Sequence, residues 1–308
     1  MEPTGDHHSH GALGAGVTTE AAQAAGALQA HRPMLLGLAY RLLGSRHDAE
    51  DVLQEAYLRW LGVDRSTVAE PRRYLSRVVT RLALDRLRAR QATRETYVGP
   101  WLPEPVPTEP SPFGPLDRAE LRDSLSTALL HVLERLTPPE RAVYVLHTAF
   151  DLPYAEIAEI LDRTPEDCRQ LHHRAAARVR QEQRRFTATR SERERLLDAF
   201  LAAARDGDLA TLTGLVAKDA TAWNDGGGRA RAARNPVTGA DRIARFFAGI
   251  YGPGSRSWTL RRLELNGEPG ALLVRADGSR YTLTVTAADG RITGVYVVGN
   301  PAKLPSVD

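Results

Sequence analysis

Two arginine-rich stretches contain the side chains whose types and spacing are best suited to chemistry. Residues 72–94 include eight arginines and a single acidic residue, Asp85, and residues 163–185 include seven arginines and three acidic residues. Guanidinium groups that recur along a helix are suited to contacts with phosphates. Both stretches are therefore candidates for binding nucleic acid. The alternative is a solvated helix surface, because the chain uses arginine throughout and has only two lysines.

The segment 152–180 has the pattern of a helix-turn-helix. Pro153 can occupy the first position of one helix, and Thr164 is a natural N-cap for a second helix that begins at Pro165. Four residues of the second helix recur at three- and four-residue steps and must face inward: Cys168, Leu171, Ala175 and Val179. The outer face is then left with Arg169, Gln170, His173 and Arg174. A second helix with a basic polar face is the kind that enters a major groove; an ordinary helical hairpin is the alternative.

An acidic helix is predicted from residue 48 to residue 60. Its buried side consists of Val52, Leu53, Ala56 and Trp60. Asp48, Asp51 and Glu55 fall along one exposed side, at three- and four-residue steps. The helix dipole stabilises acids near a helix start, so these residues have a purely structural interpretation. The functional interpretation is a docking face for a partner rich in arginine or lysine.

A basic helix is predicted over residues 74–90. Its apolar side chains alternate with the arginines of the first stretch: Leu75, Val78, Leu82 and Leu87. Tyr74 or Tyr97 could stack on an unpaired base, although packing is the plainer role for each ring.

Composition divides the chain into five parts. These are a disordered tail (1–27), a helical domain (28–95), a linker (96–117), a second helical domain (118–187) and a third domain (190–308). The tail is rich in Gly, Ala, Thr and His and has no usable period. The linker has seven prolines between Pro100 and Pro115, which cannot continue a helix or donate to a sheet. Trp101 and Leu102 can anchor it.

The third domain combines helices with strands. Helices are predicted over residues 191–204 and 240–250. Strands with alternating polarity follow, at residues 258–263, 271–275, 281–286 and 292–298. The turns between them contain Asn-Gly or Asp-Gly pairs. Helices followed by a meander predict a small α+β domain.

The order of these motifs resembles the extracytoplasmic-function (ECF) group of sigma-70 factors. An acidic helix of the form Asp-Ala-Glu-Asp-x-x-Gln-Glu (48–55) precedes a basic helix containing Leu-Ala-x-Asp-x-Leu-Arg (82–88). A linker and a helix-turn-helix containing Tyr-Ala-Glu-Ile-Ala (154–158) complete the order. The resemblance covers about residues 28–187 and implies a transcription initiation factor whose partners are core RNA polymerase and promoter DNA.

The resemblance also implies roles for individual residues. The positions that match the region binding the clamp of the large catalytic subunit are Asp48, Glu50, Asp51, Gln54 and Glu55. Those in the segment that opens and binds the minus-10 element are Arg73, Tyr74, Arg77, Arg81 and Arg88. Those on the minus-35 recognition helix are Thr164, Arg169, Gln170, His173, Arg174 and Arg178. Arg81 departs from the asparagine of many relatives, which bears on minus-10 base preference.

The third domain is similar to SnoaL-like domains of the nuclear-transport-factor-2-like fold, a cone-shaped α+β barrel with a pocket. Sigma factors of the SigJ type carry such an extension, with an Asp-Gly-Gly-Gly motif and an Asn-Pro-x-Lys-Leu tail. The matching residues, which the resemblance marks as regulatory, are Asp225, Gly226, Gly227, Gly228, Asn300, Pro301, Lys303 and Leu304. The resemblance implies that this domain modulates the sigma factor, so that no separate anti-sigma factor is required.

Catalysis by the third domain is not expected. Residues 191–308 contain no histidine and no cysteine, which removes the usual imidazole and metal chemistry. We expect no catalytic residue, no metal site and no cofactor. Asp225 could act as a base if buried, but the glycines after it favour a turn residue at positive φ. A small ligand can be accommodated among five aromatic residues that otherwise form core: Trp223, Phe246, Phe247, Tyr281 and Tyr296.

Composition restricts the remaining classes. No apolar run approaches the roughly 20 residues that cross a bilayer, and no secretory signal pattern opens the chain, so a cytoplasmic protein is predicted. Cys168 is the single cysteine, and the net charge of +3 decides nothing. One alternative function is a ligand-sensing helix-turn-helix regulator that binds DNA without polymerase; another is an enzyme fused to a DNA-binding module. Residues 48–90 favour the sigma factor, because such a regulator needs neither an acidic docking helix nor a second basic domain.

Overall fold

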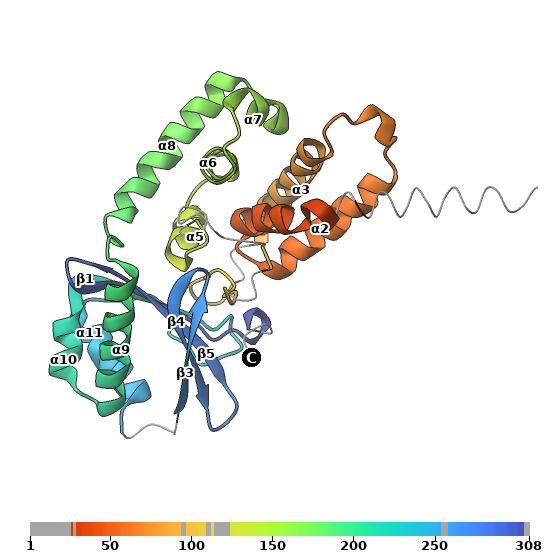
Figure 1. Ribbon diagram of the computed structural model, residues 1–308. Coiled ribbons are helices and arrows are strands. Elements are labelled where there is room, and N and C mark those ends of the chain that lie inside the picture. The colour runs from red at the N-terminus through yellow and green to blue at the C-terminus, as the bar shows by residue number, and fades with distance from the viewer. Residues whose placement is uncertain are drawn as a thin grey trace, which may run out of the picture.

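The computed structural model describes residue 26 and residues 29–93, 97–108, 112–113, 124–253 and 258–304. Figure 1 shows two groups of helices, with α8 running from the second group toward a sheet that is covered on one face by further helices. The predicted tail 1–27 lies outside the described residues apart from Gly26. Among the helices within these ranges, none combines the length and apolar character needed to cross a bilayer.

The first helical group contains the acidic and basic helices. Its members are a helix over residues 29–43, α2 (Arg46–Leu61), the short 3-10 helix η1 (Arg65–Thr67) and α3 (Pro71–Thr93). Ser45 caps α2 by accepting a hydrogen bond from the Asp48 amide. The apolar residues predicted to face inward on both helices are buried, including Val52, Trp60 and Leu75.

The second helical group contains the helix-turn-helix. Its members are α5 (Thr127–Leu133), α6 (Pro138–Phe150), α7 (Tyr154–Leu161) and α8 (Pro165–Gln183). Thr164 caps α8, as predicted, and Asp162 closes α7 in the left-handed conformation. Pro153 is not the first helical residue: its ψ of 151° is extended, and it is the N-cap of α7.

The third domain has three helices and a six-stranded mixed sheet. Its elements are α9 (Arg190–Asp206), α10 (Leu209–Leu215), β1 (Val216–Asp225), β2 (Val237–Thr238), α11 (Ala240–Tyr251), β3 (Trp258–Leu265), β4 (Glu268–Arg275), β5 (Arg280–Ala288), β6 (Arg291–Val298) and the 3-10 helix η3 (Pro301–Lys303). The strand order is β2-β1-β6-β5-β4-β3, with β1 parallel to β6 and the other pairs antiparallel. The sequence analysis missed α10, β1 and β2.

The two faces of this sheet have different partners. One face buries its apolar side chains against α9, α10 and α11, around Phe200 and Phe247. The opposite face packs against the linker and α5, in a smaller apolar cluster that includes Leu102, Ala128 and Tyr296. Leu102 is fully buried there, as expected of an anchor. The third domain therefore contacts both the linker and α5 through this face of its sheet.

The two helical domains are not separate in this structure. A single cluster of buried apolar side chains runs through both, and α3 contacts α6 and α7. Two buried arginines reinforce the junction: Arg141 of α6 pairs with Glu134, and its Nε donates to the carbonyl of Arg41 at 3.3 Å. Burial lowers the pKa of Arg41 to about 10. The two basic helices, expected to be spatially distinct, therefore lie in one packed unit.

Candidate functional site

The acidic residues of α2 are partly matched by arginines of α3. The two oxygens of Asp48 contact Arg86, at 3.4 Å, and Arg90, while Asp51 contacts Arg86 at 3.0 Å. The remaining acids form pairs within α2: Glu50 with Arg46 and Glu55 with Arg59. Gln54 is exposed. Asp51 and Glu55 keep side-chain exposures of 41% and 43%, so both can still contact a partner.

Three of the arginines predicted to bind the minus-10 element contact α7 of the helix-turn-helix. Arg73 contacts Glu156 at 3.3 Å and Glu159 at 2.9 Å, and Arg77 contacts Glu159 at 3.1 Å. Arg81 donates to the carbonyls of Ile160 and Glu159 at 3.0 and 3.3 Å. Exposed pairs of this kind contribute at most about 1 kcal/mol each. Together these contacts hold α3 beside α7.

The other two minus-10 candidates have different surroundings. Arg88 pairs with Asp85, one helical turn away, and remains 61% exposed. Tyr74 packs on Trp60 with ring centroids 5.4 Å apart and ring planes tilted by 42°, and it is half-buried. Tyr74 therefore has the packing role that the sequence favoured.

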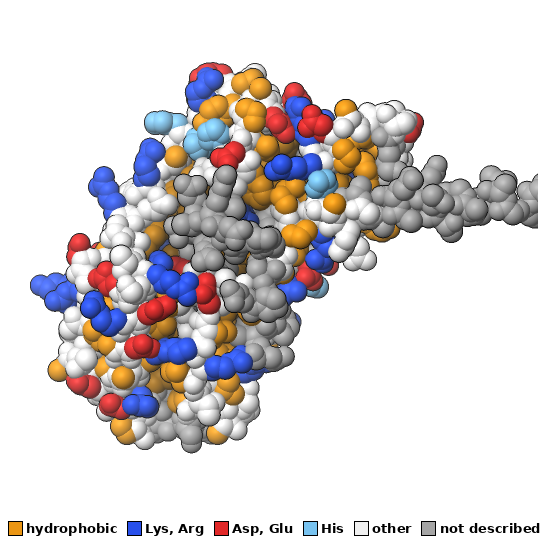
Figure 2. Space-filling view, in the orientation of Figure 1, with side chains coloured by type: hydrophobic (Ala, Val, Ile, Leu, Met, Phe, Trp, Pro, Cys, Tyr) orange, Lys and Arg blue, Asp and Glu red, His pale blue; other side chains and the backbone are white. Residues whose placement is uncertain are grey.

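The outer face of α8 has the predicted composition. Arg169, Gln170 and His173 are exposed, and Figure 2 shows basic and histidine side chains along the edge of the molecule formed by this helix. Arg169 pairs with Glu166 and lies over the Tyr154 ring at 5.6 Å. The sequence indicated this face because the apolar residues of α8 recur on the opposite side of the helix.

Arg174 and Arg178 are held by a buried glutamate of α6. Glu140, part of the capping box with Thr137, accepts hydrogen bonds from Arg174 at 3.4 Å and Arg178 at 3.0 Å. Burial alone would raise the pKa of Glu140, but the hydrogen bonds from Thr137 and the nearby guanidinium groups lower it. Both arginines stay 55% exposed. They can still reach phosphates, from a position that Glu140 sets.

The carboxylate of Asp225 joins the linker to the third domain. Asp225 is fully buried at the end of β1. Its oxygens accept hydrogen bonds from the Tyr97 hydroxyl at 2.5 Å, the Leu102 amide at 2.8 Å, the Gly227 amide at 3.1 Å and Lys303 Nζ at 2.7 Å. Asn300 donates to Tyr97 at 3.1 Å. We call these residues (Tyr97, Leu102, Asp225, Asn300 and Lys303) the Asp225 cluster.

The expectation that Asp225 is a turn residue at positive φ is wrong. The positive φ angles belong to Gly227 and Gly228, at 55° and 71°. A side chain at Gly227 would collide with Asn300, because an added Cβ would lie 2.2 Å from its amide nitrogen. The glycines thus allow the close approach of the 300–304 segment, while Asp225 supplies the buried acceptor.

Lys303 contacts the linker by charge and by aromatic surface. Its ammonium donates to the Leu102 carbonyl at 2.5 Å and lies 4.0 Å from the Trp101 ring centroid and 5.2 Å from that of Tyr97. Burial lowers the pKa of Lys303 to about 8, against the opposing charge of Asp225. Pro301 and Leu304 flank it, and Leu304 is buried against the linker side of the sheet.

The linker also contacts the first domain. Glu104 accepts hydrogen bonds from the amides of Arg46 at 2.8 Å and His47 at 3.3 Å, so a linker carboxylate binds the N-terminus of α2. Burial raises the pKa of Glu104, although these amides oppose the shift. Asn266 of the third domain accepts from the Val106 amide at 3.0 Å and donates to the Tyr40 hydroxyl. These polar contacts therefore join the linker to both the first and the third domain.

The predicted aromatic ligand site is only partly formed. Trp223 and Tyr296 stack on each other at 4.9 Å and contact His131 of α5, on the linker side of the sheet. Phe247 is fully buried core. Phe246 and Tyr281 do line a cavity of about 380 Å³, on the opposite side of the sheet from the linker. Strand alternation separates the rings, because neighbouring side chains point to opposite faces.

Sequence reasoning missed the residues that join the domains. They are Glu104, Glu156, Glu159, Asn266 and Glu268; the last accepts a hydrogen bond from the Thr127 amide at 3.1 Å. Glu104 had one signal, an acid between the prolines of the linker. The acids of α7 and the Asn-Gly turn at Asn266 carried only signals of local structure, since their partners lie far along the chain.

Comparisons with known proteins assign each part of the chain. The family model for sigma-70 region 2 matches residues 27–93, that for sigma-70 region 4 matches residues 126–179, and that for the SnoaL-like domain matches residues 197–298. The first match contains α2 and α3, the second contains the helix-turn-helix, and the third contains most of the sheet and α11.

Individual relatives extend the match to nearly the full length. The ECF RNA polymerase sigma factor SigJ of Mycobacterium tuberculosis is 38% identical over 287 residues, which are 89% of this chain and 91% of that protein. The RNA polymerase sigma-E factor of Streptomyces coelicolor is 33% identical over 48% of this chain and 78% of its own length. The crystal structure of M. tuberculosis SigJ superimposes with a TM-score of 0.69 at 34% identity, covering 90% of this chain and 96% of that one. The chain therefore belongs to the ECF sigma-70 factors, which direct RNA polymerase to promoters, and it carries a SnoaL-like domain.

Proposed function

We propose that this sigma factor is regulated by its own third domain, which keeps the two DNA-binding domains closed on each other until core RNA polymerase binds. The observation that carries the proposal is the contact of Arg73, Arg77 and Arg81 with α7. These guanidinium groups must release the carboxylates and carbonyls of α7 before they can bind DNA with their full set of donors. In the closed form the minus-10 face of α3 is therefore occupied by the domain that should bind the minus-35 element.

The third domain favours this closed form through the linker. The Asp225 cluster holds the start of the linker, and Asn266 holds the Val106 amide further along it. Glu104, between these points, is bonded to the N-terminus of α2. Separating α3 from α7 requires the linker to move, and the buried hydrogen bonds and ion pair of the third domain oppose that movement. Regulation then needs no separate anti-sigma factor.

The interfaces follow from the exposed residues. We propose that Asp51, Gln54 and Glu55, with Asp48 and Glu50 beside them, dock on the clamp of the large catalytic subunit, and that the outer face of α8 binds the minus-35 element. The boundaries proposed for the two helical domains are residues 28–95 and 118–187, with the third domain at 190–308. The protein works in the cytoplasm, where polymerase and DNA are found.

The third domain is proposed as a regulator and not as an enzyme. A catalytic base needs a lone pair directed at a substrate. Both oxygens of Asp225, the carboxylate considered for that role, are engaged by linker and tail donors. The ligand-sensing regulator without polymerase is disfavoured by the sigma-70 region 2 match.

Run-off transcription with purified core enzyme tests the closed form. Glu159→Arg removes the carboxylate that holds Arg73 and Arg77 and places a like charge beside them. We expect output to rise several-fold over the unmodified chain, and a chain lacking residues 190–308 to lose the response to this substitution. Asp241→Arg, an exposed charge reversal in α11, is the matched control. Equal output from Glu159→Arg and Asp241→Arg would contradict the proposal.

A further inference from the structure

The third domain encloses a cavity on the side of the sheet opposite the linker. It measures about 380 Å³ and lies between α11 and the ends of β1, β3, β4, β5 and β6. Its apolar lining includes Phe246, Ile250, Tyr251, Trp258 and Tyr281. The rings of Tyr251, Trp258 and Tyr281 follow one another at centroid distances of 4.6 and 5.7 Å. Cavities of this size and character suit small molecules with planar rings.

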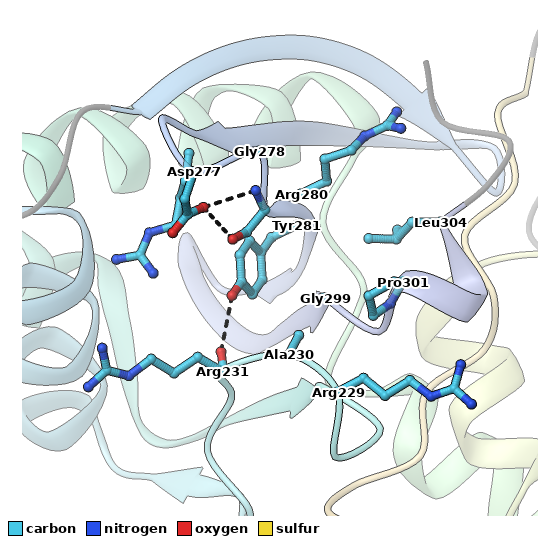
Figure 3. Close-up of a pocket in the computed structure, with 12 residues that line it drawn as sticks. Arg229, Ala230, Arg231, Asp277, Gly278, Arg280, Tyr281, Gly299, Pro301 and Leu304 are labelled. Atoms are coloured by element: carbon cyan, nitrogen blue, oxygen red, sulfur yellow. Dashed lines mark hydrogen bonds between the residues drawn. The ribbon is translucent and has the colours of Figure 1, made fainter.

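An arginine-lined groove adjoins the cavity. The groove, about 610 Å³, shares Arg231, Arg275, Tyr281 and Gly299 with the cavity lining. Figure 3 shows Tyr281 at its centre, with its hydroxyl bonded to the Arg231 backbone, and the Arg229 and Arg231 side chains extending to either side. Within the described residues, the side chains of Arg229, Arg231 and Arg275 form no ion pair. The arginine-lined groove is therefore continuous with the aromatic cavity.

Two buried polar groups in the cavity have no hydrogen-bond partner among the residues that the structure describes. Asn224 is only 4% exposed, and its amide nitrogen Nδ2 is unpaired. Nε of Arg275 is also buried and unpaired, while its guanidinium lies 4.7 Å from the Trp258 ring centroid. Native structures seldom leave buried donors unsatisfied, since the lost hydration is not recovered. Both groups are donors, and both line the same cavity. Acceptor atoms of a bound molecule, best anionic ones, would satisfy donors of this kind.

We propose that this cavity binds a small aromatic carboxylate. Its carboxylate accepts from Arg275 and Asn224, and its rings lie among Phe246, Tyr251 and Trp258. Arginine suits this role because its planar group can bind a carboxylate with two parallel hydrogen bonds while stacking on an aromatic face. Arg231, common to groove and cavity, provides positive charge along the entry path.

One strand carries both the ligand contact and the linker contact. In β1, Ala222 belongs to the helix-covered core and Trp223 to the linker side, so Asn224 points to the cavity and Asp225 toward the linker. Gly299, a cavity residue, directly precedes Asn300 of the Asp225 cluster. Ligand binding at Asn224 and Gly299 therefore acts on the segments that hold the linker. This regulatory consequence rests on the proposed function, whereas the binding site does not.

Calorimetric titration of the full chain tests the site. The probe is 2-naphthoate, and its matched control is 2-naphthalenemethanol, which has the same rings and a neutral alcohol. We expect naphthoate to bind with a Kd at least about tenfold lower than the alcohol. Arg275→Leu and Asn224→Leu should each reduce that preference to about twofold, whereas Arg242→Leu, an exposed arginine of α11 outside the cavity, should retain it.

The outcomes separate the site from the regulation. Equal Kd values for the two compounds, absence of binding, or an unchanged preference in both cavity variants overturns the carboxylate site, provided that circular dichroism shows folded protein. Arg275→Lys, which keeps the charge, should retain part of the preference. In run-off transcription, saturating naphthoate should change the output of the full chain and not that of Arg275→Leu. If naphthoate binds but leaves transcription output unchanged, only the proposed link between the cavity and the linker is overturned. If Glu159→Arg fails to raise transcription output, only the proposed function is overturned.

Discussion

At the level of single residues, Asp225 and Lys303 form a buried ion pair that brings the linker and the 300–304 segment together. Lys303 is fully enclosed by the Asp225 carboxylate, the Leu102 carbonyl and the rings of Tyr97 and Trp101. A buried ion pair adds little net stability over an apolar pair of similar size, but removing one partner leaves an uncompensated charge. The pair therefore specifies where the linker docks.

Removing one partner of this pair should destabilise the third domain. Lys303→Met leaves Asp225 with three of its four donors, so we expect a loss of about 3 kcal/mol in the free energy of unfolding, at the lower end for a broken buried pair. Asp225→Asn combined with Lys303→Met should recover most of it, because no buried charge remains. Urea unfolding followed by tryptophan fluorescence measures both. A double variant no more stable than the single one would contradict the assignment.

Lys303 also predicts a pH dependence of the closed form. Burial lowers its pKa to about 8, whereas an amine released to water titrates near about 10.4. Between these values the released state binds more protons, so raising the pH favours the closed state; below about 8 the group is charged in both states and has no effect. The pKa of Tyr97 is raised by burial and by Asp225, so above about pH 10 its titration favours the released state and opposes the effect of Lys303. The other charged groups acting on Lys303 are Arg90 and Glu134.

This pH effect is measured by subtraction. The urea midpoint of the unmodified chain, relative to that of Lys303→Met, should rise between about pH 8 and pH 9.5 and stay level between about pH 6.5 and pH 7.5. Comparing the two chains removes the contribution of all other titrating groups. A difference that falls across the upper interval would show that the ammonium is more stable in the closed state than in water.

At the level of elements, the structural contacts of α2 lie apart from its more exposed acidic residues. Its inner face packs on α3, Ser45 and Glu104 bind its N-terminus, and Asp48 is tied to Arg86 and Arg90. Asp51 and Glu55 lie on the outer face with exposures above 40%. Residues that contribute little to folding can be changed without unfolding the helix.

Charge reversal on this face should weaken polymerase binding. The double variant Asp51→Arg/Glu55→Arg is expected to bind core RNA polymerase at least about tenfold more weakly in a pull-down, because cationic residues of the partner would meet like charges. Its circular dichroism should match that of the unmodified chain. Asp198→Arg/Glu194→Arg, on the exposed side of α9, provides the control. Unchanged binding by the α2 variant would count against α2 as the docking helix.

The helix α8 should contribute specificity and salt dependence separately. Arg169 and Gln170 lie in its N-terminal half, where recognition helices meet base edges, and Arg178 lies a further two turns along. Substituting Gln170 with Ala should reduce discrimination between promoters by about 1–3 kcal/mol if it binds a base. Arg178→Ala should instead weaken binding to all sequences and lower the salt slope by about one. Fluorescence anisotropy with two minus-35 sequences distinguishes the two; identical effects of both substitutions would remove the assigned roles.

At the level of the whole molecule, the 300–304 segment connects the third domain to the linker. Asn300 reaches Tyr97, Lys303 reaches Leu102, and Leu304 fills the apolar cluster shared by the linker and the sheet. The segment follows β6 directly, so the sheet sets its position. Figure 1 shows this end of the chain lying beside the linker and below the first helical group.

Removing this segment should raise transcription output. A chain that ends at residue 299 loses the Lys303–Asp225 pair and the Leu304 contact, so the linker is released and the closed form is weakened. We expect run-off output to exceed that of the full chain several-fold. A chain that ends at residue 304 keeps every one of these contacts and is the matched control. Equal output from the two shortened chains would discard the segment as a regulatory element.

The sequence by itself determined the elements and their order. Helices, caps and most strands follow local rules, because the 3.6- and 2-residue periods place apolar side chains on one face regardless of distant contacts. Thr164, the inward face of α8 and the basic outer face were predicted in this way. The exceptions are the short elements α10 and β2 and the strand β1. In β1, Lys218 and Asp219 interrupt the alternation, and the pairing with β6 joins residues more than 70 positions apart.

Only the tertiary structure decided which side chains meet. Tyr97 and Asp225 are 128 positions apart, Lys303 and Leu102 are 201 apart, and Arg77 and Glu159 are 82 apart. No local pattern encodes such pairs, since a carboxylate or a guanidinium can be satisfied by water as readily as by a distant partner. Where a group is buried, water is excluded, and the fold decides which protein groups form its hydrogen bonds. That selection packs the two basic helices into one unit, which also contacts the linker.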